Sequence, residues 1–262
     1  MYHVLSMLCS TMESRIVINN LPSQDTLASN IASVQSNIAQ AAERVGRRAD
    51  EITLVAVSKT KPVELIKLAY DLGLRDFGEN RVQDALPKIA EFRHAGLQSV
   101  TWHMIGHLQR NKVTKVVGSF DSVQSVDSLQ LAQALNTHAS ELEVRIAVLL
   151  QVNVSGEESK EGMTLEETPP LARQIVTLPH LDVQGLMTVA PQVQDLEEVR
   201  PVFRMLRTLR DDLQRQVPQS AWQHLSMGMT DDYGVAIEEG ATIVRVGRAI
   251  FGERAYVSQA TV

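Results

Sequence analysis

The sequence contains little of what stabilises a secreted scaffold or crosses a membrane. Its 262 residues include one cysteine, Cys9, which cannot form an intrachain disulfide and therefore favours a reducing compartment. Apolar runs are short: the run over residues 146–150 is far below the roughly 20 residues that a membrane helix needs. We therefore expect a cytoplasmic protein without a membrane span.

Basic residues are also scarce relative to acidic ones. The chain has 25 Lys and Arg against 31 Asp and Glu, for a net charge of −6, which argues against broad affinity for nucleic acid or an anionic membrane. It contains no P-loop, CxxC, GxSxG or dinucleotide-binding motif. With 44% hydrophobic and 21% charged residues, it has the composition of a globular protein and not of a disordered one.

No linker rich in proline, glycine or charge divides the chain, so we expect residues 23–262 to form one domain. Residues 1–22 are predicted to be a flexible N-terminal extension. Their first part, MYHVLSMLCSTMESR, lacks the basic leading region of a signal peptide, and Met12 is an alternative first residue.

Short apolar runs alternate with amphipathic segments along the domain. The expected strands are 53–59, 75–80, 102–106, 121–126, 145–154, 182–190, 224–229 and 242–247. The expected helices are 27–45, 62–73, 81–93, 108–117, 128–139, 171–178, 195–216 and 231–239. Alternating strands and helices predict a parallel sheet, and eight units at this length match a single-domain (β/α)8 TIM barrel. A doubly wound open sheet is the structural alternative, but it should show a glycine-rich turn where this chain has SKTKP.

Functional residues of such a barrel lie at the carboxyl ends of its strands. Strand alternation places Val55, Val57 and Lys59 on one face, so Lys59 should project into the barrel mouth if the valines fill the barrel. A partly desolvated lysine tends to lose its proton and then becomes a nucleophile toward carbonyls. The alternative is a lysine in solvent at the rim.

The last two expected strands carry a second group of residues. Ser226 and Gly228 share one strand face, and Arg245 and Gly247 share another. Glycines let the backbone N–H groups approach an anion, and barrels of this type often bind phosphate after strands 7 and 8. Each glycine taken singly also fits a plain strand-to-helix turn. Arg245, facing inward, needs an acceptor, which a structural carboxylate or a ligand would supply.

The second and third strand ends carry weaker signals. Asn80 suits either a ligand contact or a helix cap, with the cap favoured by spacing alone. His103 and His107 are four residues apart but lack a third ligand, so we predict no metal site. The basic residues Arg110, Lys112 and Lys115 are most simply a solvated helix face.

Six ordered segments carry a family likeness: LVAVSKTKP, FGENRVQ, IGHLQRNK, GLMTVAP, LSMGMTDDY and VRVGRAIFGER. Together they resemble the pyridoxal phosphate homeostasis proteins, stand-alone barrel relatives of the alanine racemase N-terminal domain. The resemblance runs from about residue 52 to residue 254. It implies that Lys59 carries pyridoxal 5′-phosphate as a Schiff base and that Arg245 faces the pyridine nitrogen.

The resemblance also implies the rest of the cofactor site. Ser226 and the backbone N–H groups around Met227, Gly228, Gly247 and Arg248 would hold the phosphate. Asn80 and Met187 would line the ring, and His107 and Asn111 would belong to the pocket rim. Because the family often has threonine where this chain has Arg248, a hydroxyl contact at that position is in doubt, whereas a backbone contact is not.

Arg245 can only donate to the pyridine nitrogen, so it opposes protonation of the ring and weakens the ring as an electron sink. Two functions fit this environment: a non-catalytic monomer that buffers pyridoxal phosphate and delivers it transiently to apo-enzymes, and an amino-acid racemase. We favour the first, because racemases of the related type add a second domain and a partner's tyrosine, while Tyr256 is too isolated for that role. An aldolase that uses Lys59 on a sugar phosphate is a third, weaker interpretation.

Overall fold

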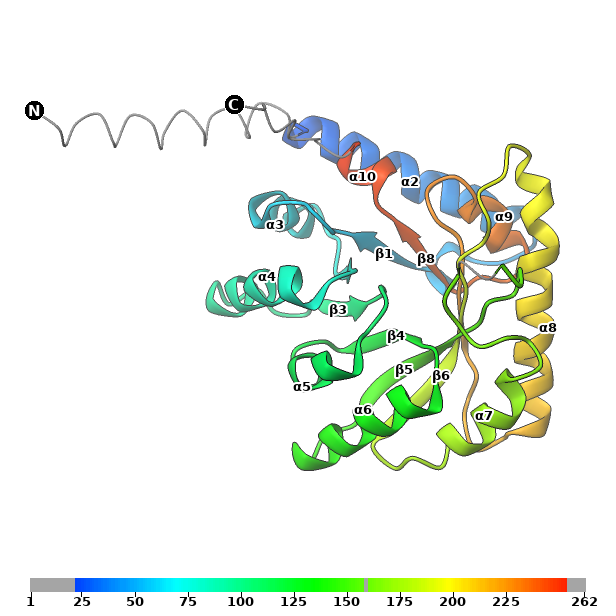
Figure 1. The fold of residues 1–262 in the computed structure, drawn as a ribbon. Helices are drawn as coiled ribbons and strands as arrows, with labels where there is room; N and C mark the ends of the chain where they lie inside the picture. The colour runs from blue at the N-terminus through cyan, green and yellow to red at the C-terminus, as the bar shows by residue number, and fades with distance from the viewer. Residues whose placement is uncertain (1–21, 158–159, 254–262) are drawn as a thin grey trace, which may run out of the picture.

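The computed structural model describes residues 22–157 and 160–253 of the chain, so the expected extension over residues 1–22 lies almost wholly outside the described residues. Eight parallel strands close into a barrel in chain order, with helices around it (Figure 1). The strands are β1 Thr53–Val57, β2 Asp76–Glu79, β3 Thr101–Met104, β4 Ser122–Val126, β5 Ile146–Gln151, β6 Leu181–Met187, β7 His224–Ser226 and β8 Ile243–Val246. The predicted (β/α)8 TIM barrel is confirmed.

Helices follow the strands as the alternating pattern predicts. They are α2 Gln24–Arg44, α3 Val63–Asp71, α4 Val82–His94, α5 Val113–Val116, α6 Leu129–Glu141, α7 Thr168–Ile175, α8 Arg200–Gln216, α9 Tyr233–Glu238 and α10 Arg248–Phe251. The described part of the chain includes no helix that is both long and apolar enough to span a membrane.

Several expected boundaries were wrong. The helix expected over 108–117 is a 3₁₀ turn at Arg110–Lys112 followed by the short α5. The strand expected over 145–154 is shorter, because β5 covers only Ile146–Gln151, and β6 with 7 residues is longer. Asp195 caps a 3₁₀ turn over Leu196–Val199 by accepting from the Glu197 N–H, and α8 begins only after it.

Helix α2 packs on the outside of the barrel against α9 and α10 (Figure 1). Ser23 caps α2 by accepting from the Thr26 N–H at 3.2 Å. The predicted apolar stripe is buried from Leu27 to Ala42, but Val45 is 41% exposed because the helix ends at Arg44. Asn30 Nδ2 donates to the Ile250 carbonyl at 3.0 Å, which fixes α2 against α10.

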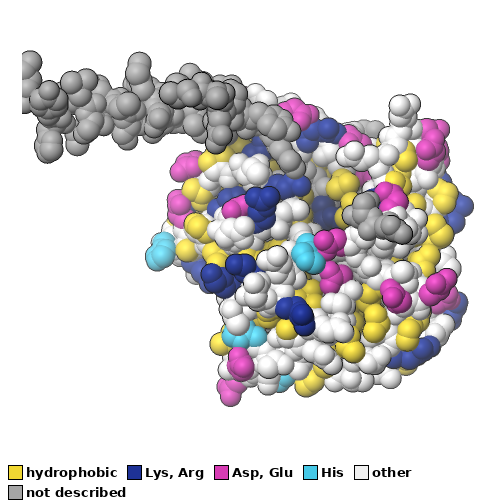
Figure 2. Space-filling view, in the orientation of Figure 1, with side chains coloured by type: hydrophobic (Ala, Val, Ile, Leu, Met, Phe, Trp, Pro, Cys, Tyr) yellow, Lys and Arg dark blue, Asp and Glu magenta, His cyan; other side chains and the backbone are white. Residues whose placement is uncertain are grey.

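The barrel separates two apolar regions. The larger core lies between strands and helices, whereas a small cluster fills the interior: Val55, Leu149, Met187 and Ile243. Val55 therefore lies in the barrel interior, as expected if the valines of the first strand fill the barrel. Over the face seen in Figure 2, basic and acidic side chains are interspersed and do not gather by sign.

Candidate functional site

The turn after β1 carries Lys59 at the carboxyl end of the barrel. The Lys61 N–H donates to the Ser58 carbonyl at 3.1 Å, closing a tight turn around Lys59 and Thr60. Lys59 is partly exposed. Thr60 has φ +63°, a left-handed conformation that is uncommon for a β-branched residue and costs free energy. The structure therefore places Lys59 at the mouth of the barrel. Contacts with the rest of the protein must keep its turn in the strained conformation.

Three side chains that the sequence analysis did not single out hold this turn in place. Ser58 Oγ donates to Glu79 Oε1 at 2.7 Å. Lys88 Nζ, from α4, donates to the same Oε1 at 2.7 Å and to the Ser58 carbonyl at 2.9 Å. The Glu79 side chain is fully buried. No sequence motif marks this group, because α4 brings Lys88 to it by packing on the barrel.

The loops after β7 and β8 place two glycines near the same end. A Cβ added to Gly228, which has φ +94°, would lie 2.7 Å from Ala236 Cβ and 2.8 Å from Tyr233 Cα. A Cβ on Gly247 would lie 3.3 Å from the Val57 carbonyl oxygen. No backbone carbonyl in the described part of the chain accepts from the N–H of either glycine. These N–H groups suit an anion.

The other residues predicted around the phosphate differ in what they can offer. The Met227 N–H is used, because it donates to the Ile243 carbonyl at 3.1 Å. The Arg248 side chain pairs with Asp231 and lies 3.6 Å from Glu253. A contact from Arg248 to an anion would therefore come from its backbone, as the sequence analysis predicts.

Ser226 and Arg245 meet inside the barrel. Arg245 Nη1 donates to Ser226 Oγ at 2.6 Å, and Nη2 donates to the Thr188 carbonyl at 2.8 Å. Burial lowers the pKa of Arg245 to about 10, so the guanidinium keeps its charge at neutral pH. Two of its five N–H groups are thereby used, and the others can serve a ligand. Ser226 itself donates to Gln124 Oε1 at 2.7 Å, so its hydroxyl is occupied in this structure.

Asn80 directly follows β2 and Met187 ends β6, so both lie at the carboxyl end of the barrel. Met187 is 1% exposed and belongs to the interior cluster. Asn80 Oδ1 is buried and has no hydrogen-bond partner among the described residues. Gly106 lies against the Asn80 backbone, since a Cβ there would be 2.3 Å from the Asn80 carbonyl oxygen. The unpaired amide oxygen needs a donor, such as a ligand hydroxyl.

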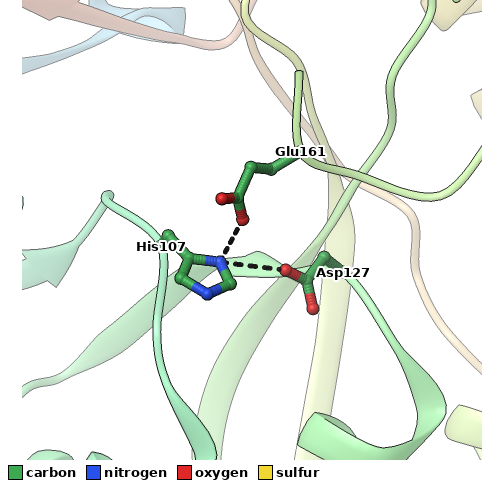
Figure 3. A group of neighbouring side chains, drawn as sticks. All are labelled: His107, Asp127 and Glu161. Atoms are coloured by element: carbon green, nitrogen blue, oxygen red, sulfur yellow. Dashed lines mark ion pairs between the residues drawn. The ribbon is translucent and has the colours of Figure 1, made fainter. Parts of the chain in front are cut away.

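The two residues predicted at the pocket rim, His107 and Asn111, differ in their positions. His107 lines a cavity of about 180 Å³ together with Asn80 and Lys112, but Asn111 is exposed and is not among its lining residues. Figure 3 shows His107 between Asp127 and Glu161, with His107 Nδ1 3.3 Å from Asp127 Oδ2 and paired with Glu161. The ligand atoms of these three side chains lie within 4.8 Å of one another. Such atoms also bind divalent cations, and the fold brings to His107 the further ligand types that its sequence neighbours lack.

The chain is similar to proteins of a known family. The model of the alanine racemase N-terminal domain family matches residues 29–255. A pyridoxal phosphate homeostasis protein of Aquifex aeolicus is 44% identical over 226 residues, covering 86% of this chain and 97% of that protein. One of Escherichia coli K12 is 42% identical over 231 residues, covering 88% and 97%. The chain belongs to the pyridoxal phosphate homeostasis protein family.

Solved structures agree with this membership. PipY of Synechococcus elongatus, solved with pyridoxal phosphate bound, is 37% identical with a TM-score of 0.76, covering 86% of this chain and 100% of PipY. An alanine racemase of Clostridium difficile is 18% identical with a TM-score of 0.68, covering 88% of this chain and 60% of the racemase. At that identity the likeness to the racemase shows a shared fold.

Proposed function

We propose that this chain binds pyridoxal 5′-phosphate at the mouth of its barrel, with Lys59 as the residue that forms the Schiff base. The observation that supports the proposal is the position of Lys59, Gly228 and Gly247 just after β1, β7 and β8, with Arg245 inside β8. The β8 strand pairs with both of the others, so these groups come together by topology. When bound, the cofactor supplies an aldehyde that condenses with a primary amine.

The residues around Lys59 fit the parts of this cofactor. The free N–H groups of the two glycines, with the Arg248 backbone, would bind the phosphate. The charged Arg245 would donate to the pyridine nitrogen and keep it unprotonated. Met187 and Asn80 would border the ring, and the unpaired Asn80 amide oxygen suits the cofactor's hydroxyl group. Ser226 would contact the phosphate only by giving up a hydrogen bond, so its position favours a role in holding Arg245.

The role that fits these features is non-catalytic: storage of pyridoxal phosphate and its transient delivery to apo-enzymes by a monomer in the cytoplasm. Two arguments support it. In the proposed orientation, an arginine at the pyridine nitrogen would weaken the cofactor as an electron sink. The chain covers 97% of the Aquifex aeolicus protein, which is named a pyridoxal phosphate homeostasis protein. The shared barrel makes racemization of amino acids the second candidate.

Reduction of the holo-protein with borohydride, followed by peptide mapping, tests the attachment. We expect the label on Lys59, and Lys59→Ala should lose the yellow colour while keeping the fold. Lys61→Ala is the matched control, because Lys61 Nζ donates to the carbonyls of Phe251 and Gly252 at 3.0 and 3.1 Å and is committed to α10. A label on another lysine would overturn the assignment of Lys59.

The carrier role is tested by transfer from the holo-protein to an apo-enzyme, compared with free cofactor at equal concentration. Faster or more complete reactivation by the holo-protein supports delivery. A D/L amino-acid assay run on the same preparation addresses the second candidate. Rapid turnover that disappears in Lys59→Ala would reverse the ranking in favour of a racemase.

A further inference from the structure

Five polar side chains form a hydrogen-bonded chain through the barrel interior. Asp76 Oδ1 lies 2.9 Å from His103 Nε2, and His103 Nδ1 lies 3.1 Å from Gln124 Nε2. Gln124 Oε1 accepts from Ser226 Oγ at 2.7 Å, and Ser226 Oγ accepts from Arg245 Nη1 at 2.6 Å. The strands β4 and β7 are not neighbours in the sheet, so the link between Gln124 and Ser226 crosses the barrel.

The hydrogen-bonded side chains are buried except for Asp76, at the end farthest from Arg245. Gln124 and Ser226 have no exposed surface, and His103 and Arg245 are 6% and 4% exposed. The Asp76 side chain is 28% exposed and stands at the amino end of β2, away from the mouth. A buried polar group that loses its hydrogen-bond partner is destabilising, so each of the five side chains depends on the next.

The orientation of Gln124 sets the direction of donation along these five side chains. Arg245 can only donate, so Ser226 accepts from it, and the Ser226 hydroxyl donates to Gln124 Oε1. The amide nitrogen of Gln124 must then face His103 Nδ1, which therefore acts as an acceptor. The remaining ring proton of His103 lies on Nε2 and is donated to Asp76. One tautomer of His103 is thus fixed by an arginine on the opposite side of the barrel.

We propose that Asp76 and His103 are positioning residues for Arg245, acting through Gln124 and Ser226 to fix the orientation of the guanidinium. This inference rests on the proposed function, in which Arg245 faces the pyridine nitrogen. The carbonyl of Thr188 holds Nη2, and the chain holds Nη1. Loss of either would let the guanidinium turn, and the ring nitrogen would lose its fixed donor.

Nitrogen NMR of the apo-protein tests the direction of hydrogen-bond donation along the five side chains. We expect His103 to carry its proton on Nε2 and to leave Nδ1 bare at neutral pH. In Gln124→Glu the new carboxylate cannot donate, so His103 should become protonated on both nitrogens. His138, which pairs with Glu141 on the outside of α6, serves as the internal reference and should not change. A His103 that carries its proton on Nδ1 in the wild type would overturn the proposal.

The absorption spectrum of bound pyridoxal phosphate tests the effect on Arg245. Asp76→Leu and Gln124→Leu should shift the absorption maximum. Asp76→Asn keeps an acceptor for His103 and should therefore keep the wild-type maximum. Thr242→Val is the control for general destabilisation, because Thr242 Oγ1 accepts from the Leu225 N–H at 2.9 Å and is not one of the five hydrogen-bonded side chains. Unchanged spectra in both leucine variants would overturn the proposal.

The two hypotheses fail in different ways. If the wild type binds no pyridoxal phosphate, the proposed function is wrong. Measurements on the apo-protein then test whether the hydrogen-bonded side chains position Arg245. In that case the side-chain N–H signals of Arg245 should be protected from exchange in the wild type and lose protection in Gln124→Leu. Equal exchange in the two proteins would reject the positioning role.

Discussion

Lys88 Nζ lies 2.7 Å from Glu79 Oε1, between α4 and the barrel wall and directly behind the turn that carries Lys59. The same nitrogen donates to the Ser58 carbonyl at 2.9 Å. Glu79 is fully buried, and its Oε2 has no hydrogen-bond partner among the described residues. The pair therefore ties the start of the Lys59 turn to α4, at a place where an unpaired charge would be costly.

Removal of Lys88 should destabilise the protein strongly. In Lys88→Met the Glu79 carboxylate would remain buried without its counter-ion, which costs about 3–5 kcal/mol. We expect urea unfolding to show a loss of that size, together with weaker cofactor binding because the Lys59 turn loses the hydrogen bond from Lys88 to the Ser58 carbonyl.

Two further variants separate this effect from a general cost of losing an ion pair. Lys67→Met breaks the more exposed pair with Glu91, whose side chains are 31% and 47% exposed, and should cost about 1 kcal/mol or less. The double variant Lys88→Met/Glu79→Gln should recover much of the stability, because no buried charge is left alone. An equal loss in Lys67→Met and Lys88→Met would contradict the role given to the buried pair.

A methyl group at position 228 should weaken binding of the cofactor's phosphate. The added Cβ of Gly228→Ala would meet Ala236 Cβ at 2.7 Å, so the loop must move and its N–H groups with it. We expect the affinity for pyridoxal phosphate to fall about tenfold or more, which is ~1.4 kcal/mol, while affinity for unphosphorylated pyridoxal changes little.

Gly73→Ala provides the matched control for backbone strain. Gly73 has φ +100°, but its added Cβ would meet nothing within 4 Å. Both variants should lose stability, and only Gly228→Ala should lose affinity for the phosphorylated cofactor. Parallel losses for pyridoxal and its phosphate would show that the loop does not bind the phosphate.

Thr60 stores backbone strain beside Lys59, and its removal should raise stability. Its φ of +63° is disfavoured for a β-branched residue but tolerated by asparagine. We expect Thr60→Asn to raise the free energy of unfolding by ~1 kcal/mol, since the Thr60 side chain is exposed and loses little packing. Ser99→Asn, at a similar φ of +60° far along the chain, is the comparison. Lower stability in Thr60→Asn would show that the threonine side chain itself is needed.

The barrel and its inward faces were predictable because they depend on periods of residues close in sequence. Alternation along a strand places Val55 and Arg245 on the inner face, and the structure agrees. Eight apolar runs of strand length leave few architectures. The start of α7 was missed because Pro169 and Pro170 broke the apolar period. The turn before it, where Thr164 and Glu167 exchange hydrogen bonds at 3.0 and 3.1 Å, would have indicated it.

The interior polar contacts could not be predicted in the same way. Gln124 lies 102 positions from Ser226 in sequence, and nothing in the run 121–126 shows which residue it faces across the barrel. The link from Lys88 to Glu79 depends on how α4 rests on β2. The direction of Arg245 follows from local alternation, but the side chains that hold it follow only from the closure of the sheet.

Two carboxylates should change stability with pH in opposite directions. Burial raises the pKa of Asp232, so the native state holds that proton more tightly than the unfolded chain. Stability is therefore lost as the pH rises from about 4 through the raised pKa. Asp232→Asn, which keeps an acceptor for the Met229 N–H, should gain stability relative to the wild type over that window.

Glu238 provides the opposite case. Its hydrogen bond with Arg200 lowers its pKa, so its contribution is present above about pH 4.3 and is lost as the pH falls through the lowered pKa. Glu238→Gln should therefore be less stable than the wild type at neutral pH, and the difference should shrink on acidification. Urea unfolding of the three proteins between pH 3 and pH 7 measures both differences. Because burial disfavours the charge of Asp232 and an arginine favours that of Glu238, differences of the same sign would contradict one of the two assignments.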